Sequence, residues 1–180
     1  MNVPIEPKAE TDAVRGGSVP IIDLASIDLT RIVGDKNEIE AWIPHRGRMS
    51  LLDGVVWVAP DKTAGVAVKR VGHDEFWVDG HFPGKPLFPG VLQVEAAAQL
   101  ACYLFVTRRG EPATPAFLRI EQCSFRSMVL PGDTFYLLCR EVKYQKRRFI
   151  SDIQGVVDNR VTFDARISGM VMERDLGRLA

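Results

Sequence analysis

The 180-residue chain is long enough for one compact domain, and its hydrophobic content of 46% excludes global disorder. Acidic and basic side chains number 23 each, so a net charge of zero gives no support to nucleic-acid binding. Three cysteines without a CxxC pair indicate reduced core or near-core residues, and three histidines without an HxxH or HExxH spacing argue against a metal site.

We expect residues 1–25 to form a flexible N-terminal extension ahead of a single domain at residues 26–175. The first 20 residues are rich in Pro, Gly and polar side chains and show no periodicity. They contain no apolar h-region, and no run in the chain approaches the roughly 20 apolar residues of a membrane helix. The sequence therefore predicts a soluble, cytoplasmic protein that does not bind membranes.

Two short helical segments are predicted after the extension, at about Asp28–Val33 and Lys36–Trp42, the second ending before Pro44. Leu51–Val58 and Thr63–Val71 flank the turn-like sequence APDK and predict a β-hairpin.

The C-terminal part of the chain predicts further strands with short connections. The sequence LPGD and the pair Asp158 and Asn159 are typical of turns. The expected strands are Phe117–Met128, Thr134–Tyr144, Arg148–Val157 and Val161–Met172. Short connections between successive strands indicate an antiparallel sheet.

One long helix is predicted, opened by Pro89 and Gly90 and running from about Val91 to Val106. Its sequence, VLQVEAAAQLACYLFV, places apolar residues on every face, which is typical of a helix enclosed on all sides. The pattern therefore predicts an α+β fold in which an antiparallel sheet surrounds one buried helix.

Glu95 is the residue that does not fit this buried helix. An ionised carboxylate in a dry interior costs several kcal/mol unless it is paired. Gln99 lies four residues on, over the same face, and could hydrogen-bond to it. One interpretation is a functional carboxyl group whose pKa is raised by burial; the other is a polar stripe at a dimer seam or wet edge.

The loop before this helix carries His81. Residues 80–91 read GHFPGKPLFPGV, and three Pro and three Gly exclude regular helix or central strand. We expect Phe82, Pro83 and Gly84 to support His81 as part of this stiff loop. The first N–H groups of the helix are left free, and with the helix dipole they form a possible oxyanion site.

These parts suit elimination of water from a 3-hydroxyacyl thioester. An imidazole is a base of near-neutral pKa for the C2 proton, and free amides stabilise the developing enolate oxygen. A carboxyl group of raised pKa could protonate the departing hydroxyl. A one-base route, in which His81 makes both proton transfers and Glu95 orients water, fits equally well.

The segment GHFPGKPLFPGVLQVEAAAQ closely resembles the signature loop and helix of the (3R)-hydroxyacyl-acyl-carrier-protein dehydratases of fatty acid synthesis. IPHRGRMSLLD at Ile43–Asp53 and FRSMVLPGDTF at Phe125–Phe135 are similar to two further segments of that family and occur in the same order. The similarity spans roughly Trp42–Met172.

The resemblance implies a hot-dog fold and a homodimer, often grouped as a trimer of dimers. It implies an active site at the dimer interface, with His81 from one subunit and Glu95 from the other as catalytic residues. The amides near Gly90 and Val91 would bind the thioester carbonyl. The substrate would arrive on the phosphopantetheine of an acyl carrier protein, with no bound cofactor or metal. Since that carrier is acidic, the basic segment Lys146–Arg148 has two interpretations: a docking site for the carrier, or a solvated basic turn, which we favour.

The chain departs from the family pattern at three positions. Gly47 and Arg48 follow the PHR tripeptide where an aromatic residue and Pro are common, and Asp79 stands where Gln is frequent. His45 and Arg46 have two interpretations: a second pair lining the active-site entrance, or a hydrogen-bonding anchor for the loop, which we favour.

Two other functions remain open at this level. A hot-dog thioesterase would hydrolyse the acyl thioester, although such enzymes generally lack the GHFPG histidine. A non-catalytic acyl-binding module of a specialised lipid pathway would have no need of both His81 and Glu95.

Overall fold

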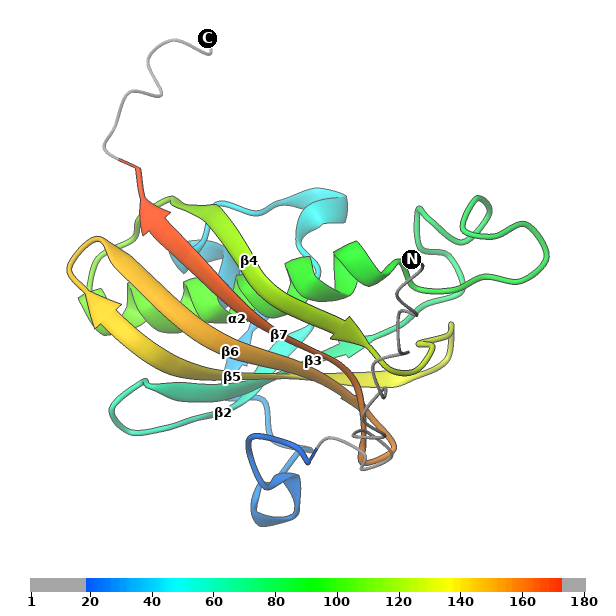
Figure 1. The fold of residues 1–180 in the computed structure, drawn as a ribbon, viewed down its shortest axis with the longest axis horizontal. Helices are drawn as coiled ribbons and strands as arrows, with labels where there is room; N and C mark the ends of the chain where they lie inside the picture. The colour runs from blue at the N-terminus through cyan, green and yellow to red at the C-terminus, as the bar shows by residue number, and fades with distance from the viewer. Residues whose placement is uncertain (1–18, 173–180) are drawn as a thin grey trace, which may run out of the picture.

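The computed structural model describes residues 19–172, which form one antiparallel sheet wrapped around a long helix (Figure 1). The strands are β1 (Gly34–Asp35), β2 (Gly54–Val58), β3 (Ala64–Arg70), β4 (Pro115–Phe125), β5 (Thr134–Gln145), β6 (Arg148–Val157) and β7 (Arg160–Val171). Their order in the sheet is β1-β2-β3-β5-β6-β7-β4. β4 therefore pairs only with β7 and leaves one edge of the sheet open.

The long helix α2 (Gly90–Arg109) lies on one face of the sheet, and most of its residues are buried. It ends where Gly110 adopts a left-handed φ of +82° and donates its N–H to Val106 O, an arrangement for which glycine is favoured. Within residues 19–172, α2 alone is long and apolar enough to cross a membrane, but 72% of its apolar window is buried inside the protein. The α+β architecture predicted from the sequence is confirmed.

The remaining helices are short: α1 (Lys36–Trp42) and two single 3-10 turns, Leu24–Ser26 and Gly47–Met49. The predicted helix at Lys36–Trp42 and the predicted hairpin, now β2 and β3, are confirmed. The two-residue β1 is not predicted by the sequence pattern. Asp158 and Asn159 connect β6 to β7 with φ of +48° and +59°, as a tight hairpin turn requires.

The predicted helix at Asp28–Val33 is wrong, since this stretch consists of turns. Asp28 Oδ1 accepts hydrogen bonds from the backbone N–H and the hydroxyl of Thr30, at 3.0 and 2.6 Å. A short polar side chain that bonds to the nearby backbone offers the chain an alternative to helix.

The predicted extension, residues 1–25, lies largely outside the described residues. Its described part packs against the sheet and is not a free tail: Leu24 is buried, and Ile21 N–H donates to Gln154 Oε1 at 2.7 Å. The segment lies on the side of the sheet opposite α2 (Figure 1). It covers an apolar cluster built from Val56, Val66, Val68, Leu138, Val156 and Val161. This cluster is joined by Ile21 and Ile22 of the segment and by Ile27 and Leu29, which follow it in the chain.

Among the glycines that the structure describes, Gly155 on β6 has the least space for a Cβ atom. A Cβ atom added there would lie 2.3 Å from the Phe135 ring and 2.6 Å from the Phe163 ring, and both rings are fully buried. We expect Gly155→Ala to lower the free energy of unfolding by about 1–3 kcal/mol, because rings in a packed core cannot shift freely. Chemical denaturation measures this change.

Gly80→Ala is the control, because no atom lies within 4 Å of a Cβ at that position. Equal stability of the two variants would contradict the packing argument.

Candidate active site

The loop between β3 and α2 is held by a buried cation. Lys69 on β3 is 4% exposed, and its Nζ lies 2.5 Å from Glu75 Oε1 in the loop. The Lys69 Nζ also lies 5.7 Å from the centre of the buried Phe88 ring, which packs against Trp77 at 5.2 Å between centroids. Because a buried ammonium requires its counter-ion, these contacts fix the loop that carries His81.

The orientation and tautomer of His81 are set by the same loop. His81 N–H donates to Trp77 O at 2.8 Å, and Leu87 N–H donates to His81 O at 2.7 Å. The ring Nδ1 lies 2.8 Å from Leu87 O. Since a carbonyl oxygen only accepts, Nδ1 carries the proton and Nε2 of the neutral ring has its lone pair available. This arrangement is suited to a general base.

Phe82, Pro83 and Gly84 follow His81 in an exposed turn. The Phe82 ring stacks on the His81 ring at 4.2 Å between centroids, and Phe82 and Lys85 exchange backbone hydrogen bonds of 2.9 and 3.2 Å. Gly84 has φ of +72°, a value that disfavours other residues. These contacts are compatible with the supporting role expected for the turn.

The N-terminus of α2 lies beside His81. Leu92 N–H and Gln93 N–H bond to Pro89 O, whereas Gly90 N–H and Val91 N–H have no hydrogen-bond acceptor within residues 19–172. A cavity of about 520 Å³ is lined by both of these residues and by His81. The Val91 side chain is 75% exposed. The free amides and the helix dipole can therefore stabilise negative charge next to the imidazole.

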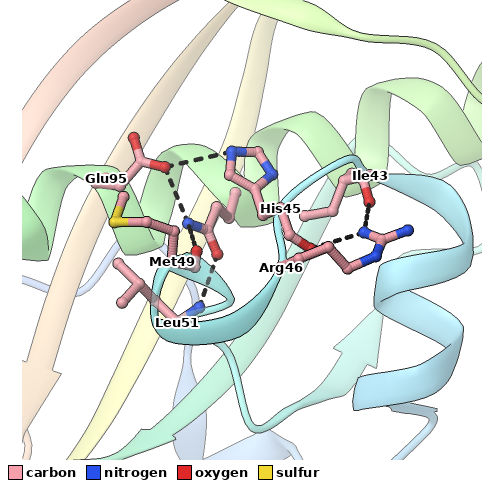
Figure 2. A network of polar contacts seen from close by, with 7 residues as sticks. Ile43, His45, Arg46, Met49, Leu51 and Glu95 are labelled. Atoms are coloured by element: carbon pink, nitrogen blue, oxygen red, sulfur yellow. Dashed lines mark hydrogen bonds and ion pairs between the residues drawn. The ribbon is translucent and has the colours of Figure 1, made fainter. Parts of the chain in front are cut away.

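Glu95 lies further along α2 and contacts two side chains (Figure 2). Its Oε1 accepts from Gln99 Nε2 at 2.9 Å, as the sequence spacing predicts, and lies 3.3 Å from His45 Nε2. The hydrogen bond from His45 lowers the pKa of Glu95 below its ordinary value, against the opposing effect of burial, and Gln99 lowers it further. The expectation of a raised pKa is wrong, because the carboxyl group is only partly buried and has two donors.

His81 and Glu95 line different cavities in the protomer. Glu95 lines a small cavity of about 60 Å³ together with His45, Gln99 and Cys102, and this cavity does not include His81. A larger cavity of about 640 Å³, between the end of α1 and the C-terminal end of α2, includes none of the predicted site residues. Within the described part of one chain, the two predicted catalytic residues are therefore not brought together.

Sequence reasoning did not connect His45 with Glu95. The segment Ile43–Asp53 lies far from α2 in sequence, so only tertiary structure reveals the contact. Arg46 does anchor the loop, since its guanidinium donates to the backbone oxygens of Glu40, Ile43 and His45 at 2.7 Å each. The PHR tripeptide, residues 44–46, was the one feature of the sequence that could have drawn attention to His45.

The other residues singled out in the sequence are at the surface or inert. Gly47 and Arg48 form the 3-10 turn Gly47–Met49, and Asp79 and His73 are exposed. Burial raises the pKa of both Cys102 and Cys139 to about 12, whereas Cys123 is exposed on β4 and is not a core residue. Residues 19–172 contain no cluster of three or more potential metal-ligating side chains.

A family model described as a FabA-like domain matches residues 43–166. Two curated relatives are the 3-hydroxyacyl-(acyl-carrier-protein) dehydratase FabZ of Rhodopseudomonas palustris, 34% identical over 77% of this chain and 93% of the relative, and that of Rickettsia africae, 35% identical over 78% and 97%. A third, the bifunctional enzyme LpxC/FabZ of Porphyromonas gingivalis, is 40% identical over 68% of this chain, but the match covers only 26% of that protein.

Two solved structures show the same fold at low sequence identity. The dehydratase heterocomplex ApeI:P from Xenorhabdus doucetiae matches 78% of this chain and 95% of its own, with a TM-score of 0.67 and 15% identity. A hypothetical thioesterase with coenzyme A from Streptococcus pneumoniae matches 67% and 85%, with a TM-score of 0.51 and 9% identity.

The architecture is that of the hot-dog fold, which dehydratases and thioesterases share. Within that class the chain belongs to the FabA-like family, as the resemblance in its sequence predicts.

The lowered pKa of Glu95 predicts a pH-dependent contribution to stability. A carboxyl group whose pKa is lowered by folding stabilises the fold above the ordinary glutamate pKa of 4.5, and the contribution is lost as the pH falls through the lowered value. Glu95→Gln should therefore lose stability relative to the natural protein at neutral pH, with the difference shrinking in acid. Urea denaturation across this pH range measures the difference.

Glu111→Gln, at an exposed position just beyond α2, is the control for a general charge effect. A Glu95→Gln difference that is independent of pH would contradict the assigned direction of the pKa shift.

Proposed function

We propose that this protein removes water from (3R)-hydroxyacyl-acyl-carrier-protein thioesters and yields trans-2-enoyl thioesters for fatty acid or related lipid synthesis. The observation that carries the proposal is the His81 ring, which lines a cavity together with Gly90 and Val91, and whose Nε2 lone pair is left available by the hydrogen bond at Nδ1. Membership of a family whose curated relatives are named 3-hydroxyacyl-(acyl-carrier-protein) dehydratases supports it.

The proposed reaction follows from the positions of these groups. His81 Nε2 accepts the proton from C2, while the amides of Gly90 and Val91 donate hydrogen bonds to the thioester oxygen as it gains negative charge. The C2 electron pair forms the double bond to C3, and the C3–O bond breaks. The departing hydroxyl takes the proton from the His81 imidazolium and leaves as water, so the imidazole is neutral again.

The lowered pKa of Glu95 supports this one-base route. An ionised carboxylate has no proton to give to the hydroxyl, but it accepts a hydrogen bond from it. We therefore assign to Glu95 the orientation of the 3-hydroxyl and of the water product.

A second copy of the chain would complete the site. β4 is an open sheet edge, and its apolar side chains Phe117, Leu118 and Ile120 are 43–48% exposed. Unpaired strand edges and apolar patches of this kind are covered in stable proteins. We propose a homodimer, with grouping into a trimer of dimers as a further possibility, in which His81 of one protomer faces Glu95 of its partner.

The substrate would be carried on the phosphopantetheine of an acyl carrier protein, and the proposed chemistry uses no cofactor. Lys146–Arg148, the exposed turn between β5 and β6, is the proposed dock for this acidic carrier. We propose the cytoplasm as the compartment.

The activity is tested with purified protein and a 3-hydroxyacyl carrier protein. We expect enoyl product, and a loss of about 10²–10⁴-fold in kcat for His81→Ala, the usual contribution of a general base. Glu95→Gln should also be strongly impaired, because an amide presents one acceptor oxygen and a competing donor. Mass spectrometry of the carrier-bound product measures both.

The same assay separates the alternatives. Release of free acid would indicate a thioesterase, and binding without any product would indicate an acyl-binding module. Either result would overturn the proposed dehydratase.

The shared site predicts that two inactive variants restore each other. After subunit exchange, half of the dimers formed from His81→Ala and Glu95→Ala are hybrids with one intact site, so activity should recover to about a quarter of the natural level. Ile120→Lys on the β4 edge should abolish the dimer and this recovery, as light scattering and the activity assay would show.

Val142→Lys is the matched control, because Val142 is 46% exposed on β5, away from the β4 edge. Subunit exchange without any recovery would contradict a site shared between protomers.

A further inference from the structure

We propose that His45 is a positioning residue for Glu95, holding the carboxylate ionised and turned so that one oxygen faces the substrate. The inference rests on the proposed dehydratase function, since it assigns the group that prepares Glu95 for that reaction.

The two donors near Glu95 converge on a single oxygen. His45 Nε2 lies 3.3 Å and Gln99 Nε2 lies 2.9 Å from Glu95 Oε1. Glu95 Oε2 has no hydrogen-bond partner among residues 19–172 and points away from both donors in Figure 2. The carboxylate is therefore fixed through Oε1, while Oε2 remains able to accept a hydrogen bond from a substrate hydroxyl.

The contact with Glu95 indicates which ring nitrogen of His45 donates. Its Nδ1 is buried and has no hydrogen-bond partner in the described part of the chain. A carboxylate oxygen only accepts, so Nε2 of His45 carries the proton in the contact with Glu95.

The backbone that carries His45 is fixed at both ends. On one side, Arg46 bonds to the oxygens of Glu40 and Ile43. On the other, the Gln99 side chain accepts from Leu51 N–H at 3.0 Å and donates to Met49 O at 2.8 Å (Figure 2). A ring on so restrained a segment can hold its partner in one orientation, as the supporting residues of active sites do.

Few other groups act on Glu95. The titratable residues that line its cavity are His45 and Cys102, and the cysteine thiol is protonated because burial raises its pKa to about 12. The cavity is otherwise lined mainly by apolar residues: Ala98, Pro115, Ala116, Phe117, Phe149, Ile167 and Gly169, with Ser168. Within one protomer, the ionised form of Glu95 is therefore favoured by His45 and Gln99. Because the partner's His81, which faces Glu95 in the proposed dimer, is the same in both proteins, removal of His45 should raise the Glu95 pKa.

The test compares pH profiles of dehydration for the natural protein, His45→Ala and His45→Gln. We expect His45→Ala to lower kcat about tenfold to a hundredfold, the range for one hydrogen bond to a charged group, with KM changed little. Since His81 must also be unprotonated to act as the base, the acid limb of the kcat profile has two components. The component that belongs to Glu95 should move to higher pH, because Glu95 then protonates more readily, whereas the component that belongs to His81 should stay in place. His45→Gln, whose Nε2 can replace the ring Nε2 as a donor, should restore most of both properties.

A titration of the Glu95 carboxyl carbon by NMR gives a readout independent of turnover. The Glu95 pKa should be higher in His45→Ala than in the natural protein, and His45→Leu replaces the alanine variant if that variant does not fold. Arg46→Ala, which removes one of the two restraints on the segment that carries His45, should raise the Glu95 pKa by less than His45→Ala does. His73→Ala, at an exposed position, should change none of these properties.

Different results would overturn the proposed dehydratase function and the positioning role of His45. A natural protein without dehydratase activity would overturn the proposed function, while the titration still tests the His45–Glu95 contact. An active natural protein whose acid limb and Glu95 titration are unchanged in His45→Ala would overturn the positioning role alone.

Discussion

The structure depends on the need to enclose α2. This helix of 20 residues has no polar face, so it is stable only when protein surrounds it. The sheet covers it from β3 to β7, with Phe135, Leu137, Ile153 and Phe163 packed beneath it. β4 extends this cover but leaves its own apolar side chains exposed, so enclosure within one chain is incomplete. Exposed side chains of β4 also border both candidate cavities: Phe117 lines the one that contains Glu95, and Phe125 lines the one that contains His81.

The two imidazoles of the proposed site have opposite roles in our proposal, and their surroundings account for the difference. The Nδ1 of His81 bonds to Leu87 O, which leaves the lone pair of Nε2 available on a ring that lines the cavity. The Nε2 of His45 lies 3.3 Å from Glu95 Oε1, and because a carboxylate only accepts, this nitrogen carries the proton. One ring is thus prepared to accept a proton and the other to donate a hydrogen bond. The same side chain acquires either role from the acceptor that one of its ring nitrogens meets: Leu87 O at Nδ1 of His81, and Glu95 Oε1 at Nε2 of His45.

Patterns local in sequence predicted most of the fold. The all-round apolar helix, the Asp158–Asn159 turn and the strands around it are confirmed, because helix period and turn chemistry are properties of neighbouring residues. The predicted helix at Asp28–Val33 is wrong because a single Asp28 side chain redirects the backbone. The open position of β4 beside β7 was also beyond sequence patterns, since it depends on which distant strands pair.

For the site, sequence reasoning found the reactive residue types but not their electrostatics. The His81 loop, the helix N-terminus and the Glu95–Gln99 spacing follow from motifs. The direction of the Glu95 pKa shift does not, because it is decided by His45, which lies 50 positions away from Glu95 in the chain. Burial inferred from helix pattern alone overestimated how dry the carboxyl group is.

The described N-terminal segment has a consequence for how copies of this protein can associate. By sealing the apolar cluster on the convex side of the sheet, Leu24 and its neighbours make that side unavailable for back-to-back stacking of two sheets unless the segment is displaced. Association through the strand edge or through the helix side would need no such displacement.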